Sequence, residues 1–205
     1  MDTETLLTTT RSVRRKLDLD RPVPPEVIAD CLRVAQQAPA AGSMLTAQRW
    51  IAVTDPAIRA GIAPFVQQSA HTSWARYADQ VESRMFASAR HLVEHIGEVP
   101  ALVIPCMPGP PPSTPVEQSA YYGSIYPAIW SFQLALRTRG LASSLCSYHV
   151  VDHEEDVAKL LGIPEGFTQI GLIAVAYSKQ AEFSPAPRPP VEEILSFDAW
   201  AGPRR

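Results

Sequence analysis

The sequence has few cysteines, no excess of positive charge and no apolar leader. Its three cysteines, Cys31, Cys106 and Cys146, form no Cys-x-x-Cys motif and leave one unpaired, which fits a reducing compartment without a disulfide framework. With 18 basic and 21 acidic residues the net charge is −3, which argues against a dedicated nucleic-acid binder. The start, Met1-Asp2-Thr3-Glu4, is acidic and lacks the core of a secretion signal. We therefore expect a cytoplasmic protein with no nucleic-acid partner.

Charge is also missing from one long segment, because no charged residue lies between Glu117 and Arg137. Polar and helix-breaking residues, among them Ser119, Gly123 and Pro127, make the segment too polar and too broken to span a membrane. A helix without a polar face must be covered on all sides. The segment is therefore predicted to be a buried helix in a protein without a membrane partner.

The remaining pattern predicts one domain, 1–205, of the α+β class. Hydrophobic residues make up 46% and charged residues 19%, as in a soluble globular protein. Helix and strand patterns follow one another without regular βαβ alternation. The predicted helices are 25–39, one opened by Asp55-Pro56, 73–97, 118–139, and one capped by Asp152 that runs to Leu161; the predicted strands are 49–54, 101–106, 141–147 and 168–177. Pro108 to Pro115 is predicted as an exposed loop, and 184–205 as an extended tail.

A cluster of phosphate-binding residue types precedes the first of these helices. Arg11 and Arg14 are three residues apart, so on a helical turn they would face one way, and Ser12 adds a hydroxyl donor. Guanidinium groups bind phosphate oxygens in a bidentate manner. Taken alone, however, these residues fit a solvated basic turn better than a ligand site.

A loop of small residues, Pro39-Ala40-Ala41-Gly42-Ser43, follows the same helix. Small side chains would allow a flat ligand to approach the backbone. Taken alone, the loop also fits an ordinary helix stop. Together, the arginine cluster and this loop suggest a phosphorylated cofactor with its flat body against the loop.

Other reactive side chains are assigned less specific roles. Cys146 has no neighbouring base in the sequence and is interpreted as a packing or ligand-lining residue. His149 is expected to be structural or substrate-lining rather than catalytic. His91 and His95 have i, i+4 spacing but no third ligand nearby, so they predict a surface helix and no metal site.

In their order along the chain, these motifs resemble the nitroreductase family of FMN-dependent oxidoreductases, and most closely an actinobacterial-type branch. The matching segments are Thr8 to Arg14, Cys31 to Pro39, Leu102 to Cys106, Tyr122 to Phe132, Leu134 to Leu141, Leu161 to Pro164 and Pro185 to Pro190. Each segment is weak alone, but the ordered set spans nearly the whole chain.

The resemblance implies a homodimer with two FMN sites across the interface and a mostly antiparallel central sheet flanked by helices. The uncharged segment would be the long central dimer helix. Arg11, Ser12, Arg14 and Arg188 would hold the FMN phosphate and ribityl chain. The Pro39–Ser43 loop would line the flavin ring, and Leu145 and Cys146 would contact the flavin from another side.

Three segments depart from the family pattern. Ser144 to Tyr148 lacks the Trp-Thr-Thr expected in the closest branch. Met44 to Trp50 is shifted relative to the usual Gln-x-Trp segment, with Gln48 as a candidate for its glutamine, and Ser43 stands where the family has an asparagine. A serine has a shorter reach and one donor where an amide has two. The implied contacts at the pyrimidine edge of the flavin therefore change.

The resemblance implies an enzyme in which FMN carries the chemistry and no side chain is catalytic. NAD(P)H would reduce the flavin and depart, and an electron-poor nitroaromatic, quinone or enone would then be reduced in the same pocket, a ping-pong mechanism. Two alternatives stay open. One is a flavin-binding or storage protein with little turnover, and the other is a specialised biosynthetic flavin oxidoreductase.

Overall fold

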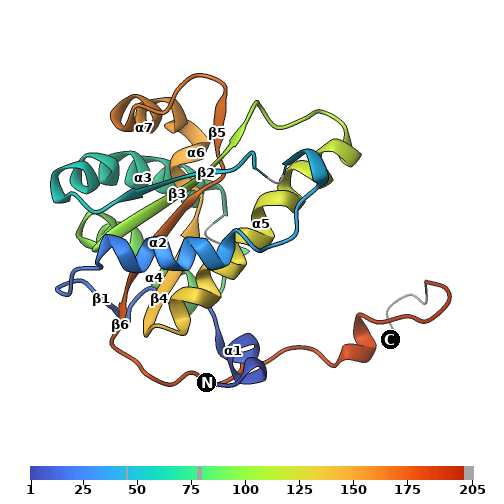
Figure 1. Ribbon diagram of the computed structural model, residues 1–205. Helices are drawn as coiled ribbons and strands as arrows, with labels where there is room; N and C mark the ends of the chain where they lie inside the picture. Colours follow the sequence, from blue (N-terminus) through green and yellow to red (C-terminus); the bar gives the residue numbers. More distant parts are fainter. Residues whose placement is uncertain (45, 78–79, 201–205) are drawn as a thin grey trace.

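Both faces of the central strand of the sheet are buried. The computed structural model describes residues 1–44, 46–77 and 80–200. On β3 (Ala101–Pro108), Leu102, Ile104 and Cys106 belong to one hydrophobic cluster, whereas Ala101 and Val103 belong to a second. Successive side chains of a strand point to opposite faces, so a strand that is apolar throughout must be covered on both. The sheet therefore lies between two helical layers (Figure 1).

The sheet has the order β1-β6-β3-β2, with β4 paired to β6 and β5 paired to β3. All these pairs are antiparallel. The other strands are β1 (Leu17–Asp18), β2 (Arg49–Val53), β4 (Leu141–Cys146), β5 (Phe167–Gln169) and β6 (Leu172–Ser178). The predicted α+β class with a mostly antiparallel sheet is confirmed.

Two helices, α2 (Pro25–Ala35) and α5 (Pro115–Arg137), cover one face of the sheet. The other face packs against α3 (Pro56–Tyr77), α4 (Ser83–Glu94), α7 (Glu154–Leu161) and the short helix η3 (Ile96–Glu98). Three more short helices are α1 (Thr3–Thr9), η1 (Gly42–Met44) and α6 (Tyr148–Asp152), and η4 (Val191–Glu193) lies in the tail. None of the helices in the described part is long and apolar enough to cross a membrane.

Three predicted elements differ from the observed ones. The predicted helix 73–97 is two helices, α3 and α4, whose side chains Trp74 and Phe86 meet edge to face at 5.2 Å. A continuous helix would separate residues twelve apart by about 18 Å, so this contact requires the chain to reverse. The predicted strand 168–177 is broken at Gly171, where an added Cβ would lie 2.9 Å from the carbonyl oxygen of Cys146.

The third difference concerns Asp152, which ends α6 and does not cap the following helix. His153 lies between α6 and α7, directly before the first residue of α7, and its side chain makes no capping bond. Its Nδ1 instead lies 2.7 Å from Oδ2 of Asp156. The chain therefore makes two short helices here.

The uncharged helix α5 is not covered on all sides within the chain. Its buried face includes Ile125, Ile129 and Phe132, which pack against α2 and the sheet. On the opposite side Gly123 is exposed, and Trp130 keeps 40% of its surface exposed. The helix therefore presents an uncharged face to the outside of the chain.

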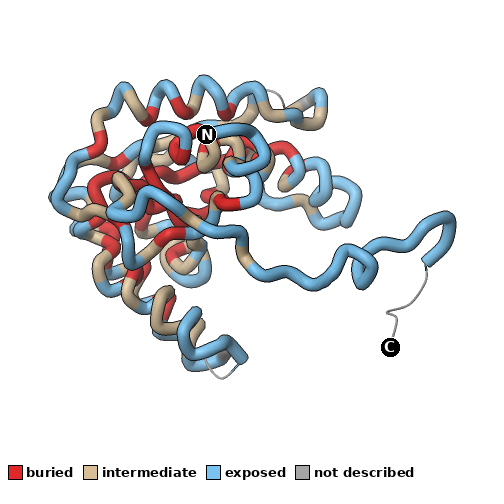
Figure 2. Tube along the Cα trace, turned by 90° about the horizontal axis from the view of Figure 1, so that it is seen from below, coloured by how far each residue is buried: buried red, intermediate tan, exposed pale blue. Residues whose placement is uncertain are grey.

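The segment after β6 is extended and largely exposed, and Figure 2 shows it leaving the body of the molecule. Its large apolar residues lie at the surface, with Trp200 at 92% exposure and Phe197 at 80%. The predicted tail is thus confirmed as extended up to residue 200, and its last five residues lie outside the described part. Phe183, directly before the predicted tail, packs against the core, and the first tail residue, Ser184, accepts a bond from Arg11 through its carbonyl oxygen.

Candidate functional site

Arg11, Ser12 and Val13 lie outside any helix beside β4 and Arg14 stands at a bend, so the expectation that Arg11 and Arg14 share a helical turn is wrong. The amide of Val13 donates to the carbonyl oxygen of Ser143 at 2.9 Å, and the Val13 side chain is buried. Because side chains alternate along extended chain, residues three apart point to opposite sides. Arg11 and Arg14 consequently reach two different cavities, and Ser12 is exposed between them and lines neither.

The first cavity brings Arg11 together with Arg188 from the tail. It has a volume of about 380 Å³, and its wall includes Thr8, Thr10 and the indole of Trp130. Arg11 donates to the carbonyl oxygen of Ser184, which holds the tail beside α1. No acidic residue is among the described residues that line it. Two uncompensated guanidinium groups with nearby hydroxyls are a donor set suited to a phosphate.

A third arginine, which the sequence analysis did not single out, lies behind the first cavity. Arg137 is only 9% exposed, donates to the carbonyl oxygen of Ala181 at 3.1 Å and lies over the ring of Phe183. Its Nε has no hydrogen-bond partner, and burial lowers the pKa of its guanidinium. Its signal in the sequence was its position as the first charged residue after the uncharged segment 118–136.

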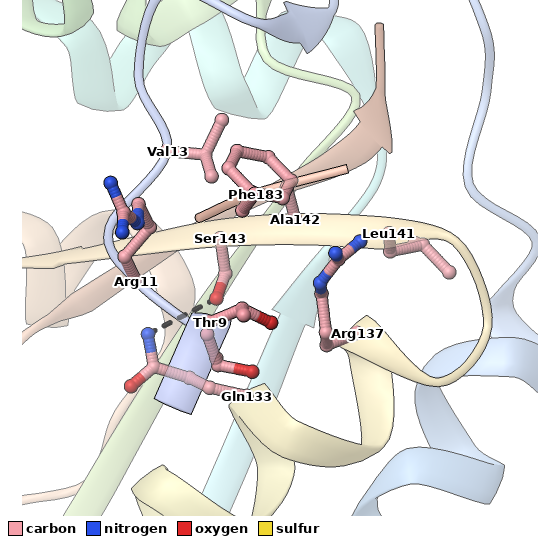
Figure 3. Close-up of a pocket in the computed structure, with 10 residues that line it drawn as sticks. Thr9, Arg11, Val13, Gln133, Arg137, Leu141, Ala142, Ser143 and Phe183 are labelled. Carbon is pink, nitrogen blue, oxygen red and sulfur yellow. Dashed lines mark hydrogen bonds between the residues drawn. The ribbon is translucent and has the colours of Figure 1, made fainter. Parts of the chain in front are cut away.

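Figure 3 shows Arg11 and Arg137 on opposite sides of a cavity of about 10 Å³, the space of one water molecule. The side-chain amide of Gln133 donates to the hydroxyl of Ser143 at 3.1 Å across this space. No acidic residue is among its described lining residues either. Arg137 therefore adds positive charge directly behind the Arg11 side chain.

The second cavity, of about 230 Å³, lies between Arg14 and the end of β4. Leu145, Cys146 and Tyr148 line it from one side, and α4 contributes Leu92. Removal from water raises the pKa of the Cys146 thiol to about 11, although the charge of Arg14 opposes this. Because only a thiolate is a good nucleophile, Cys146 is a neutral wall residue at ordinary pH.

Tyr148 is another cavity residue that the sequence analysis missed. Its hydroxyl accepts a hydrogen bond of 3.2 Å from Nε1 of Trp74, whose ring meets the Tyr148 ring edge to face at 6.0 Å. The bond leaves the phenolic proton available for another acceptor. No simple spacing in the sequence relates Trp74 to Tyr148, because their contact depends on how α3 packs against α6.

The small-residue loop lies apart from both cavities. The amide of Ala41 donates to the hydroxyl of Ser124 at 3.0 Å, so Pro39, Ala40 and Ala41 lie along the first half of α5. Gly42 and Ser43 form the start of η1, and the side chain of Ser43 lies outside the described part. None of the loop residues whose side chains are described lines either arginine cavity. One copy of the chain therefore does not bring all predicted site residues together.

The side chain of Gln48 is already engaged within the chain. Its Oε1 accepts a bond of 2.8 Å from Nε1 of Trp50. The Trp50 ring in turn packs on Phe132 of α5, with ring centroids 5.6 Å apart. The oxygen of Gln48 thus serves to fix Trp50 against the core.

His149 is fully buried and linked to Gln169 and Glu154. Its Nε2 lies 3.1 Å from Oε1 of Gln169, whose Nε2 donates to the carbonyl oxygen of Glu154 at 2.7 Å. Since the amide nitrogen of Gln169 is used as a donor, its oxygen must accept, and His149 must carry its proton on Nε2. Burial lowers the pKa of His149 to about 4, with the bond to Gln169 opposing.

Histidines elsewhere make no metal site in the described part of the chain, where no three His, Cys, Asp or Glu side chains are grouped to hold an ion. The rings of His91 and His95 contact each other at 4.4 Å, and Nδ1 of His95 lies 2.8 Å from the carbonyl oxygen of His91. The two rings therefore pack against each other at the C-terminal end of α4.

Comparison with known proteins gives one family and many similar folds. The model of the nitroreductase family matches residues 7–177. No curated protein matches the sequence.

Among solved structures, a BluB-like flavoprotein from Clostridium difficile 630 has a TM-score of 0.73 at 17% identity, covering 97% of this chain and 100% of its own. Nitroreductase A from Vibrio parahaemolyticus has a TM-score of 0.73 at 15% identity, with coverages of 100% and 79%. The NADPH:FMN oxidoreductase from Vibrio harveyi, complexed with NAD⁺, has a TM-score of 0.70 at 15% identity, with coverages of 97% and 78%. At these identities the likeness shows a shared fold.

Proposed function

This chain belongs to the nitroreductase family, and on that premise we propose that it binds FMN and uses NAD(P)H to reduce an electron-poor acceptor. The acceptor would be a nitroaromatic, a quinone or an enone, and donor and acceptor would occupy the same pocket in turn. The observation that carries the proposal is the convergence of Arg11 and Arg188 in a cavity whose described wall has no acidic residue.

Each group of residues has a part in holding the cofactor. Arg11 and Arg188 would bind the phosphate, and Arg137 would strengthen the field from behind. Ser12, which the resemblance also assigns to the phosphate, lies outside the lining of this cavity. Arg14, which the resemblance assigns to the phosphate and ribityl chain, lines the second cavity instead, and there it would lie along the flavin ring with Leu145 and Cys146. When bound, FMN supplies the hydride chemistry, and the protein orients the ring and excludes water. Cys146 stays protonated and takes no nucleophilic role.

We propose further that the Pro39–Ser43 loop of a partner subunit completes each site. The loop is separate from the arginine cavities of its own chain, and the uncharged face of α5 is open beside it. Isologous pairing of this face in a homodimer would place each loop against the other protomer. Two composite FMN sites would result.

A flavin-binding or storage protein with little turnover is the second candidate. It is favoured by Gln48, whose side-chain oxygen is bound to Trp50. The acceptor oxygen of this side chain, a candidate for the family's glutamine, is thereby occupied within the chain. A specialised biosynthetic oxidoreductase shares the same cofactor site.

The phosphate assignment is tested by titrating the purified protein with FMN and with riboflavin, which lacks the phosphate. Charge-assisted hydrogen bonds contribute roughly 1.5–3 kcal/mol, so Arg11→Ala and Arg188→Ala should each weaken FMN about tenfold to a hundredfold. Riboflavin binding should change little. Arg33→Ala, which removes an exposed arginine paired with Asp30, is the matched control. Unchanged FMN affinity in both cavity variants would exclude the phosphate site.

A further inference from the structure

Arg137, at the C-terminal end of α5, is a buried cation without an acidic partner. Only 9% of its surface is exposed, and no ion pair among the described residues includes it. Burying a charge without a counter-charge is costly, so an apolar side chain would suit this position better if packing were its only role. The side chain is covered by its own chain and is not part of the exposed face of α5.

The Arg137 guanidinium contacts the segment that leads from β6 into the tail. Its Nη2 donates to the carbonyl oxygen of Ala181 at 3.1 Å, and its central carbon lies 4.6 Å from the centre of the Phe183 ring. A cation over an aromatic face is attracted electrostatically as well as by packing. One side chain of α5 therefore holds the chain at two positions that are two residues apart.

Other bonds tie the same segment to the body of the molecule. Before Ala181, the amide of Lys179 donates to the carbonyl oxygen of Lys16 at 2.8 Å. After Phe183, the carbonyl oxygen of Ser184 accepts from the guanidinium of Arg11. The chain is therefore held in place from Lys179 to Ser184, and Arg137 supplies the contacts in the middle of this stretch.

Beyond Ser184 the tail is a stiff spacer that carries Arg188. Its sequence is Pro185-Ala186-Pro187-Arg188-Pro189, and proline-rich chain is extended, with a rise of about 3.1 Å per residue or roughly 12 Å from Ser184 to Arg188. Within the described part, the one hydrogen bond of this spacer runs from Arg188 to the carbonyl oxygen of its neighbour Pro187. The place of Arg188 therefore depends on the held segment that precedes the spacer.

We propose that Arg137 is a positioning residue, which fixes Ala181 and Phe183 and thereby places Arg188 opposite Arg11 in the first cavity. The inference rests on the proposed phosphate site. Arg137 itself does not line that cavity, so it acts on a ligand there through the tail and, to a smaller extent, through the field of its charge. Phosphate affinity thus depends on a contact that lies outside the cavity wall.

The test is a double-mutant cycle between Arg137→Met and Arg188→Ala, with the affinities for FMN and riboflavin measured by quenching of flavin fluorescence. Arg137→Met keeps an unbranched buried side chain and removes the guanidinium. Alone it should weaken FMN by about tenfold and riboflavin little. In the Arg188→Ala background only the field of the missing charge remains, so it should weaken FMN by less than about threefold.

Arg139→Met is the matched control. Arg139 is exposed at the same end of α5, and it donates to Ala135 and Thr138 of its own helix end. Its replacement should leave the affinity for FMN unchanged.

Phe183→Leu separates position from charge, because it removes the ring beneath the guanidinium and leaves Arg137 in the chain. It should weaken FMN in the native background and have no effect on FMN in the Arg188→Ala background. It decides the matter should the thermal melt of Arg137→Met show a folding defect.

Cleavage by chymotrypsin after Phe183, followed by mass spectrometry, reports on the tail without a flavin. Arg137→Met should be cut there faster than the native protein, and Arg139→Met at the native rate. Equal cutting of Arg137→Met and the native protein, or effects of Arg137→Met and Phe183→Leu on FMN that persist undiminished in Arg188→Ala, would overturn the positioning role. Unchanged FMN affinity in Arg188→Ala alone would instead overturn the proposed phosphate site, and the positioning role with it.

Discussion

At the scale of single residues, backbone conformation decides which arginines act together. The spacing of Arg11 and Arg14 suggests one basic face if the chain is helical. The bond from Val13 to Ser143 makes the chain extended, and the two guanidinium groups separate. Arg11 then meets Arg188, which is 177 residues further along the sequence, while Arg14 meets Cys146. The residue types predicted a phosphate site. Which arginines face the same cavity depended on the backbone hydrogen bond between Val13 and Ser143 of β4.

His149 gives a pH prediction at the same scale. Burial lowers its pKa from 6.5 to about 4 in the folded chain, so as pH falls the unfolded chain takes up the proton first. Stability should therefore decline as pH falls from 6.5 towards 4, by about 3 kcal/mol in all from this residue. Urea unfolding across that range should show a weaker pH dependence in His149→Gln, which keeps a donor for Gln169.

The control for this prediction is His71→Gln, since His71 lies exposed on α3. Its unfolding free energy should follow the native pH dependence. If His149→Gln loses stability with falling pH as steeply as the native chain does, the buried neutral histidine is not the origin of the acid sensitivity.

At the scale of elements, the missing charge predicted the helix α5. Its role follows from which of its residues are buried in their own chain and which are exposed. Ile129 is 1% exposed and belongs to the core of its own chain, so a charge there would test folding. The face left open contains Gly123, where an added Cβ would meet no atom within 4 Å. Glycine in a helix costs roughly 0.5–1 kcal/mol relative to alanine, and close approach of a second helix would explain its use here.

Substitution at Gly123 therefore separates dimerisation from folding. Gly123→Glu should leave the chain folded, because the isolated chain has room for the side chain and the helix gains backbone order. The new charge should break the dimer, which light scattering would report as a monomer with undiminished helical circular dichroism. Ala29→Glu, on the exposed side of α2, is the control and should remain dimeric. A Gly123→Glu variant that remains dimeric would rule out pairing through this face.

The apolar pattern predicted the strands and the longer helices, because continuous apolar runs become strands buried on both faces and apolar stripes become the core side of helices. It missed the break between α3 and α4, and that between β5 and β6. Both breaks depend on contacts between distant segments, namely Trp74 with Phe86 and Gly171 with Cys146. Tyr148 and Arg137 were missed as site residues for the same reason, since their partners lie far along the chain.

At the scale of the whole molecule, the proposed site is divided among separate parts of the fold. The cavities of Arg11 and Arg14 lie on two sides of one extended segment, and the Pro39–Ser43 loop lies along α5. The resemblance in sequence implied all three parts, whereas the structure of one chain gathers only the first two. The proposed homodimer would join the third part to them, so cofactor binding and assembly should be coupled.

The central claim, that the protein is a flavin oxidoreductase using a nicotinamide donor, is tested most directly by anaerobic reduction. Protein loaded with FMN is mixed with NADPH, and in parallel with NADH, while the visible flavin absorption is followed; a quinone is then added. We predict that at least one nicotinamide bleaches the flavin within the time of a steady-state assay, and that the quinone restores its colour. A flavin that stays oxidised with both donors would contradict the account, and the alternative of a flavin-binding or storage protein would then hold.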